Sequence, residues 1–159
     1  MTRRAAVLVA STRAAAGTYE DRTGPVIADW LRARDFEVVG PVVVPDAAIA
    51  PSLAELLAQH PDLLLTTGGT GVSPDDRTPE ATSALLDKEL PGIGEEVRRR
   101  GAEVTPTAIL SRAVAGVAGR TLVMNLPGST GGVRDGLAVL GDVLDHLLDQ
   151  ISGGDHPAH

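Results

Sequence analysis

The sequence contains no cysteine and very few aromatic residues, and each absence excludes a class of function. Its 159 residues include no Cys and one each of Trp, Tyr and Phe. Without Cys there is no disulfide, thiolate metal ligand or cysteine nucleophile, and a cytoplasmic location is expected. Because 21 acidic residues outnumber 14 basic ones and stacking aromatics are scarce, we expect no nucleic-acid partner.

Long apolar runs and lysines are also scarce. No apolar run approaches the roughly 20 residues that a membrane span needs, so we expect no membrane partner. Lys88 is the one lysine, whereas a Walker-type phosphate loop needs a lysine directly after a glycine. The four histidines are not spaced as a zinc-binding set. These patterns exclude a P-loop and argue against a zinc site.

Apolar runs of strand length alternate with helical patterns along the chain. The patterns predict strands at residues 5–11, 36–44, 62–67 and 121–125, and helices at 25–34, 52–59, 79–89, a short segment ending at 98–101, and 133–151. Trp30 is expected on a packed helix face, Thr78 as a helix N-cap and Pro91 as a helix end. Apolar rather than alternating strands indicate an α/β fold, with helices on both faces of a mostly parallel central sheet. Residues 1–152 are expected to form a single domain and residues 153–159 a flexible tail.

A glycine-rich loop follows the strand predicted at 62–67. Its candidate ligand-binding residues are Gly68, Gly69, Thr70 and Gly71. Glycines let the backbone approach a ligand closely and point successive N–H groups into a concavity, which suits an anion. The alternative is a tight turn without a ligand, and the glycines alone support both equally. Because ligands of parallel sheets bind beyond the carboxyl ends of strands, we expect the site here.

A second loop follows the strand predicted at 121–125 and precedes the long helix. Its candidate binding residues are Asn125, Pro127, Gly128 and Ser129. Backbone amides at the start of a helix suit an anion or a nucleoside. The alternative is an N-cap by Ser129 or Thr130 with no ligand.

Asp75 and Asp76 lie just after the first glycine loop. Carboxylates beside a phosphate cradle repel the ligand unless a cation lies between them, and Mg²⁺ takes one or two carboxylates together with substrate phosphates. Asp46, after the strand predicted at 36–44, is a candidate for a second carboxylate. Taken separately, Asp75 also fits a turn residue and Asp46 a helix cap.

Two further segments carry polar groups that suit an anion. Ser111 offers a hydroxyl and Arg112 a planar guanidinium, although an ordinary surface arginine is an equal alternative. The three arginines at 98–100 suit either an anion site or, more commonly, the solvated end of a helix.

Three separated motifs together resemble the molybdopterin adenylyltransferase family, which includes bacterial enzymes of molybdenum-cofactor synthesis and matching domains of gephyrin and its plant counterpart. They are TTGGTGVSPDDRTPEAT at 66–82, AILSRAVAG at 108–116 and TLVMNLPGS at 121–129. Shorter matches are YEDRTGP at 19–25, PD at 45–46 and PGIG at 91–94. The resemblance covers nearly the whole chain.

The resemblance implies a three-layer α/β/α sandwich, a molybdopterin-binding domain over residues 1–152 and a homotrimer. The implied reaction transfers AMP from ATP to the terminal phosphate of molybdopterin and releases pyrophosphate with Mg²⁺. A downstream molybdate-insertion protein is the implied partner. A non-catalytic molybdopterin-binding or assembly paralogue of the same fold is the alternative. A general nucleotide-binding or interaction module is favoured least, because it leaves both aspartates unexplained.

Individual positions take roles from the resemblance. Asp46 and Asp76 match the two functionally important aspartates of the family, and are the implied catalytic and Mg²⁺-binding residues. Ser111 matches a polar position on the pterin side, and the two glycine-containing loops match the substrate-binding loops. Many relatives have Ser-Asp where this chain has Ser11 and Thr12, so no acidic role transfers to that loop.

Overall fold

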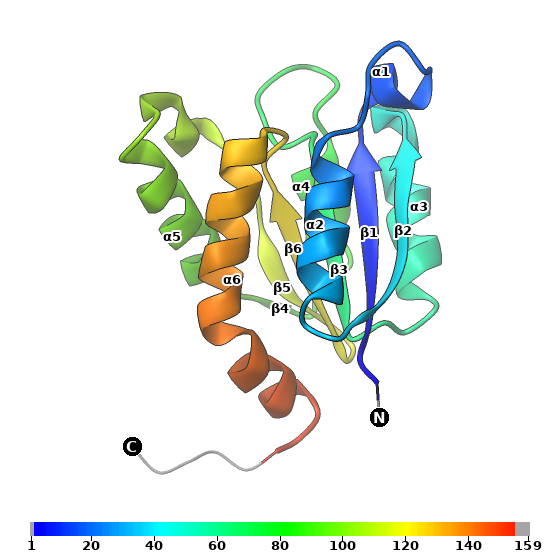
Figure 1. Cartoon of the computed structure of the whole chain (residues 1–159), viewed down its shortest axis with the longest axis vertical. Helices are drawn as coiled ribbons and strands as arrows, with labels where there is room; N and C mark the ends of the chain where they lie inside the picture. Colours follow the sequence, from blue (N-terminus) through cyan, green and yellow to red (C-terminus); the bar gives the residue numbers. More distant parts are fainter. Residues whose placement is uncertain (1, 155–159) are drawn as a thin grey trace.

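A six-stranded sheet forms the centre of the structure, a computed structural model that describes residues 2–154 (Figure 1). The strands are β1 (Arg4–Ala10), β2 (Glu37–Val44), β3 (Leu63–Thr67), β4 (Lys88–Glu89), β5 (Ala115–Ala118) and β6 (Thr121–Leu126), in the spatial order β2-β1-β3-β6-β5-β4. The first four strands of that order are parallel, whereas β5 runs antiparallel to both β6 and β4. The predicted mostly parallel α/β sheet is therefore confirmed.

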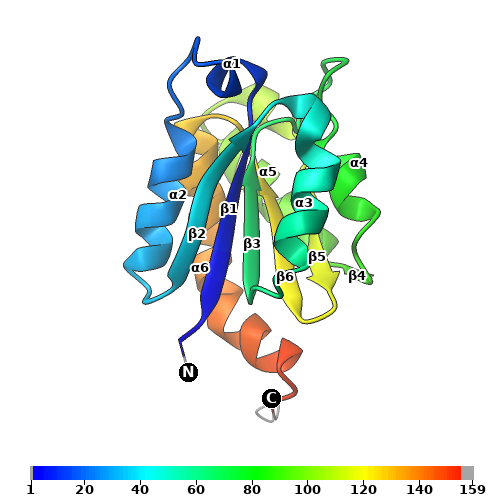
Figure 2. The same cartoon turned by 90° about the vertical axis from the view of Figure 1, so that its right-hand side faces the viewer.

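Helices cover both faces of this sheet and complete three layers (Figure 2). They are α1 (Thr12–Ala15), α2 (Thr23–Arg32), α3 (Ile49–Leu57), α4 (Thr78–Ser83), α5 (Pro91–Ala102) and α6 (Thr130–Ile151), with 3-10 turns at Asp46–Ala48 and Pro106–Leu110. Apolar residues of α2, α5 and α6 pack on one face, and those of α3 and α4 pack on the other. No helix in the described part of the chain has both the length and the apolar character that a bilayer span requires.

The central strands are apolar throughout because each side chain meets a helix layer. Val7 of β1 and Leu65 of β3 face the core shared with α2 and α6. Their sequence neighbours Leu8 and Leu64 lie on the opposite face of the sheet and pack with α3. All four side chains are fully buried. Strands buried on both faces have no polar alternation, which is the pattern that the sequence displays.

The helix predicted at 79–89 is shorter than expected. Helix α4 ends at Ser83, and Lys88–Glu89 forms the edge strand β4 against β5. Pairing with β5 fixes this segment as extended and overrides its local helical pattern. Thr78 is also not an N-cap, because Arg77 holds that position. Pro91 begins α5 instead of ending a helix, as its fixed φ permits.

Other differences from the sequence prediction are local. The first loop contains the short helix α1. The sequence pattern does not predict the short strand β5, whose four residues include Gly116. Trp30 packs against the core as predicted, although it is only half-buried, and the guanidinium carbon of Arg34 lies 3.7 Å from the centre of its ring. Residues 155–159 of the predicted tail lie outside the described residues.

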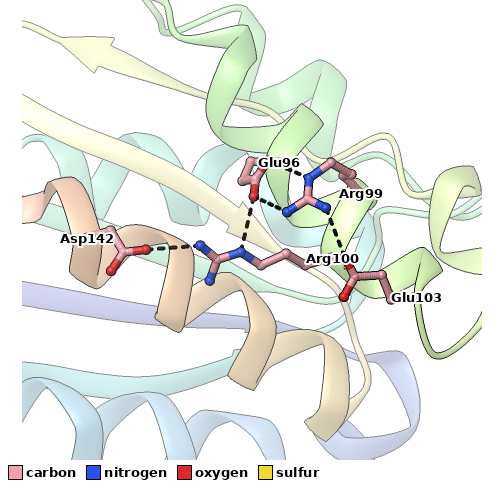
Figure 3. A network of polar contacts seen from close by, with 5 residues as sticks. All are labelled: Glu96, Arg99, Arg100, Glu103 and Asp142. Carbon is pink, nitrogen blue, oxygen red and sulfur yellow. Dashed lines mark hydrogen bonds and ion pairs between the residues drawn. The ribbon is translucent and has the colours of Figure 1, made fainter.

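An ion-pair network joins α5 to α6 and occupies two of the three consecutive arginines (Figure 3). Arg99 pairs with Glu96 at 2.7 Å and with Glu103 at 2.9 Å. Arg100 bridges Glu96 at 3.2 Å and Asp142 of α6 at 3.0 Å. Hydrogen bonds from Arg99 and then Arg100 lower the pKa of Glu96 to about 2. These arginines are therefore satisfied within the fold and do not form an open anion site.

The depressed pKa of Glu96 predicts an acid-sensitive contribution to stability. Because the pKa of Glu96 is lowered in the folded state, its ionised carboxylate stabilises the fold fully above pH 4.5. This stabilisation is lost as the pH falls toward about 2. We expect Glu96→Gln to lower the thermal unfolding midpoint near neutral pH, and the difference from the wild type to shrink below pH 4.5. Thermal unfolding followed by circular dichroism across this range measures the effect.

Glu55→Gln provides the control, because Glu55 lies exposed on α3 and makes no ion pair within residues 2–154. Its difference from the wild type gives the effect of removing one exposed surface carboxylate at each pH. A Glu96→Gln difference that is unchanged from neutral pH to pH 2.5 would contradict the assigned role of the network.

Candidate functional site

The carboxyl ends of β1, β3 and β6 meet at one edge of the sheet, beside α1 (Figure 1). From β1 the chain crosses to β2 on one side, whereas β3 and β6 lie on the other side. The β1/β3 junction is therefore a topological switch point, where open α/β sheets bind ligands. Both predicted glycine-containing loops start at this edge, after β3 and after β6.

A cleft of about 330 Å³ opens at the switch point, and we call it the switch-point cleft. Its walls include Ser11 after β1, Gly68 after β3 and Ser129 after β6. Tyr19 from the first loop also lines it and is 52% exposed, so an aromatic face is available to a ligand. The cleft is thus built from three strand ends that are distant in the sequence.

Two further clefts share the loop after β3. The larger, of about 840 Å³, contains Ser111 and is called the Ser111 cleft. Its walls combine apolar side chains such as Val97 and Leu110 with the cationic Arg98 and Arg134. The other, of about 410 Å³, is called the aspartate cleft, and its acidic lining residues are Asp46, Asp75 and Asp76.

The backbone of the glycine loop needs glycine at two positions. Gly68 has a φ of +88° and Gly69 a φ of +66°, which is the left-handed region that side chains disfavour. A Cβ on Gly68 would collide with the carbonyl of Ala10 in β1. A Cβ on Gly69 would strike the Thr78 hydroxyl and lie 3.2 Å from Asp46 Oδ1. The loop therefore passes directly against the end of β1 and the Asp46 carboxylate.

Arg112 fixes the outer part of the same loop. Its guanidinium donates to the carbonyls of Gly71 at 2.8 Å and Asp76 at 3.1 Å, and to both carboxylate oxygens of Glu80 at 2.7 Å. Its backbone N–H donates to the carbonyl of Thr70 at 2.8 Å. Because every guanidinium nitrogen bonds to protein, Arg112 is neither a free phosphate ligand nor an ordinary surface arginine.

Asp46 and Asp76 lie on the same side of the molecule, in the wall of the aspartate cleft. Asp46 Oδ2 accepts a hydrogen bond from the Thr12 hydroxyl at 2.9 Å. Asp76 Oδ2 accepts one from the Ser73 N–H at 3.1 Å, and lies 2.8 Å from the position of a Cβ on Gly71. The glycine loop therefore lies close to both carboxylates.

The donor set of this cleft fits Mg²⁺ bound together with a substrate. Within residues 2–154, no three His, Asp or Glu side chains gather into a site that holds a metal ion by itself. Two carboxylates, each with one oxygen that accepts no hydrogen bond from the described residues, match an ion that otherwise takes phosphates and waters.

The second loop divides into lining and supporting residues. Pro127 lines the Ser111 cleft, and Gly128 and Ser129 line both this cleft and the switch-point cleft. The Ser129 hydroxyl also accepts a hydrogen bond from the Gly132 N–H at 3.1 Å, so the N-cap predicted as an alternative is present. A cap and a cleft wall are compatible, because the cap uses only the side chain.

Asn125 differs from its predicted place in the site. Its side chain is 3% exposed, and its amide donates to the hydroxyls of Thr66 and Thr82 at 2.9 Å each. Its side-chain oxygen accepts from the Val114 N–H at 3.2 Å. Asn125 is therefore a buried cross-link that joins β6 to β3 and α4, and it lines none of the three clefts.

Two threonines have contacts that the sequence does not reveal. Thr12 lines the aspartate cleft and bonds to Asp46 through its hydroxyl, in a loop to which the resemblance transfers no acidic role. Thr78 is 1% exposed, and its hydroxyl finds no partner within the described chain. The sequence does not show which threonine hydroxyls are hydrogen-bonded and which are buried without a partner, so both contacts are known only from the structure.

Comparisons with known proteins show which family this chain resembles. The family described as "Probable molybdopterin binding domain" matches residues 6–146. The chain is 40% identical over 154 residues to the molybdenum cofactor biosynthesis bifunctional protein of Synechococcus elongatus, covering 96% of this chain and 48% of that protein. It is 38% identical over 152 residues to the molybdopterin adenylyltransferase of Helicobacter pylori, covering 92% of this chain and 86% of that protein.

Solved structures give the same result for the fold. The Molybdopterin biosynthesis Mog protein from Mycobacterium ulcerans matches with a TM-score of 0.91 at 50% identity, covering 96% of this chain and 99% of that chain. This chain spans about half the length of the bifunctional relatives it matches. The bifunctional relatives therefore contain further sequence beyond the region that this chain matches.

The clamp by Arg112 predicts that the glycine loop loosens when the guanidinium is replaced. Lysine cannot make the three directional contacts, so we expect Arg112→Lys to lower the local opening free energy by about 1 to 2 kcal/mol, which corresponds to roughly 5- to 30-fold faster exchange. Hydrogen–deuterium exchange at the Ser73 and Asp76 amides measures the effect. Arg77→Lys is the control, because Arg77 is exposed in the same loop and makes no side-chain hydrogen bond within residues 2–154. Unchanged exchange in Arg112→Lys would contradict the clamp.

Proposed function

This chain belongs to the molybdopterin-binding domain family, and from that membership we propose that it is a molybdopterin adenylyltransferase of molybdenum-cofactor synthesis. The proposed reaction transfers AMP from ATP to the terminal phosphate of molybdopterin and releases pyrophosphate. The observation that carries the proposal is that Asp46 and Asp76 line one cleft together with the glycine loop, beside two clefts that can each hold one substrate.

The two substrates are assigned to clefts by size and chemistry. Molybdopterin is proposed to occupy the Ser111 cleft, because about 840 Å³ with apolar walls suits a fused heterocycle and the arginines suit its phosphate. ATP is proposed to occupy the switch-point cleft, with the adenine near Tyr19. The triphosphate then extends toward the aspartate cleft, which shares Ser11 and Tyr19 with the switch-point cleft.

The reaction needs no covalent enzyme intermediate. An oxygen of the molybdopterin phosphate attacks the α-phosphorus of ATP, a new P–O bond forms, and the bond from that phosphorus to the bridging oxygen of pyrophosphate breaks. The protein has to align two anions that repel each other, and alignment with charge stabilisation is the main source of catalysis in phosphoryl transfer. Backbone amides of the glycine loop and of residues 128–130 are the proposed anion donors.

Mg²⁺, when bound at Asp46 and Asp76, supplies positive charge against the triphosphate. The chain fixes both carboxylates in advance, Asp46 through Thr12 and Asp76 through the Ser73 amide. Gly69 and Gly71 leave room beside them, since a Cβ at either position would crowd a carboxylate oxygen. The residues therefore hold their charges where the phosphates meet.

Asp76→Asn tests the proposed role of the carboxylate. Asparagine keeps the shape and can accept the Ser73 hydrogen bond through its oxygen, so the loop should fold normally. We expect adenylyl transfer to fall by on the order of 100-fold or more, because preorganised charge stabilisation is lost, while molybdopterin binding persists. Pyrophosphate release with ATP, Mg²⁺ and molybdopterin measures turnover, and fluorescence titration measures molybdopterin binding. Wild-type turnover by Asp76→Asn would refute the role.

The wild-type protein decides between the enzyme and a non-catalytic paralogue in the same assay. Release of pyrophosphate that depends on both substrates supports the adenylyltransferase. Molybdopterin binding without pyrophosphate would instead identify a binding or assembly protein.

We propose that the reaction takes place in the cytoplasm, where ATP is available. The lack of cysteine, and so of disulfides, agrees with a reducing compartment. The proposed partner is a molybdate-insertion protein that receives the adenylylated product. We also propose a homotrimer. Large apolar side chains outside the three clefts are exposed, which supports contact with another protein surface: Ile109 (63%), Val39 (44%), Val42 (37%) and Val143 (37%).

The trimer predicts a solution mass three times that of the single chain. Sedimentation equilibrium at micromolar concentration measures it, and dilution shows whether the assembly is stable. A monomeric mass throughout would contradict the trimer without bearing on the reaction.

A further inference from the structure

We infer that Thr12 is a positioning residue that orients the Asp46 carboxylate so that one of its oxygens faces the glycine loop; this inference rests on the proposed function. The contact is reciprocal. The Thr12 hydroxyl donates to Asp46 Oδ2 at 2.9 Å, and the Asp46 backbone N–H donates to the same hydroxyl at 3.1 Å. One hydroxyl thus bridges the main chain and the carboxylate of a single residue, which fixes the side chain of Asp46 relative to its backbone.

Thr12 is itself held firmly. It is the first residue of α1, whose N-cap Ser11 accepts a hydrogen bond from the Ala14 N–H at 3.2 Å. The Ser11 N–H donates to the carbonyl of Val44 at the end of β2, at 2.9 Å. Because Asp46 follows β2 by two residues, the loop after β1 and the turn after β2 are joined at two points. A β-branched side chain also has few rotamers, which restricts the hydroxyl further.

The consequence is an asymmetric carboxylate. Oδ2 is occupied by Thr12, whereas Oδ1 accepts no hydrogen bond from residues 2–154 and faces the glycine loop. Oδ1 lies 3.2 Å from the position of a Cβ on Gly69, and the buried Thr78 hydroxyl lies against the same position. Asp46 therefore presents one oxygen to the glycine loop, and tilting the carboxylate away from this orientation would require loss of the Thr12 contact.

Thr12→Val tests the inference, because valine keeps the branched shape and removes the hydroxyl. We expect about a tenfold lower kcat and a higher half-saturating Mg²⁺ concentration, with KM for molybdopterin little changed, since the lost contact is a hydrogen bond to a charged group. Thr12→Ser should restore both quantities to near the wild-type values. Thr18→Val is the matched control: its hydroxyl lies in the same loop but donates to the carbonyl of Arg13 at 3.0 Å.

A double-mutant cycle with Asp46→Ala separates positioning from general loop stability. If Thr12 acts through Asp46, Thr12→Val adds no further loss in the Asp46→Ala background. A further loss there, equal impairment in Thr12→Ser and Thr12→Val, or wild-type kinetics in Thr12→Val would each overturn the inference.

Metal binding gives a readout that does not need turnover. Mn²⁺ titration in the presence of α,β-methylene-ATP, followed by electron paramagnetic resonance, should show weaker Mn²⁺ binding in Thr12→Val and unchanged binding in Thr18→Val. If the wild type released no pyrophosphate, the adenylyltransferase proposal would fail, while this titration would still decide the role of Thr12. Equal Mn²⁺ affinity in the wild type and Thr12→Val would overturn the inference.

Discussion

The passage of the glycine loop against the end of β1 is the constraint on which the candidate site depends. Gly68 and Gly69 adopt left-handed conformations, and a Cβ on either residue would collide with its neighbours. This close approach places the loop beside Asp46, which follows a different strand, in the cleft that Asp76 also lines. Arg112 then fixes the outer half of the loop from a third segment. Four segments of the chain are thereby brought to one point.

Much of the fold follows from the sequence because its central strands and its longest helix carry strong apolar patterns. β3 and β6 are buried on both faces and α6 presents one apolar stripe, so each is predictable from local residues. The segment at 79–89 could not be predicted in this way. Its last residues pair with β5, and that partner lies about thirty residues away in the chain. Edge strands of two to four residues depend on such pairing and leave little local signal.

The candidate site was predictable to the level of position but not of orientation. The resemblance placed Asp46, Asp76 and the glycine loop together, and the structure finds them in one cleft. The resemblance could not show that the guanidinium of Arg112 is engaged in hydrogen bonds within the protein, or that Thr12 bonds to Asp46. Hydrogen-bond partners are set by three-dimensional packing, and a list of residue types does not encode which lone pairs remain available.

The buried amide of Asn125 affects how variants of this protein should be interpreted. It connects the hydroxyls of Thr66 and Thr82 beneath the loops, so truncating it would leave unsatisfied polar groups in the interior. Loss of activity after such a change would result from disruption of the buried hydrogen bonds beneath the two loops, not from the absence of a chemical group in the site. A motif position that tolerates no substitution can therefore mark scaffolding instead of chemistry.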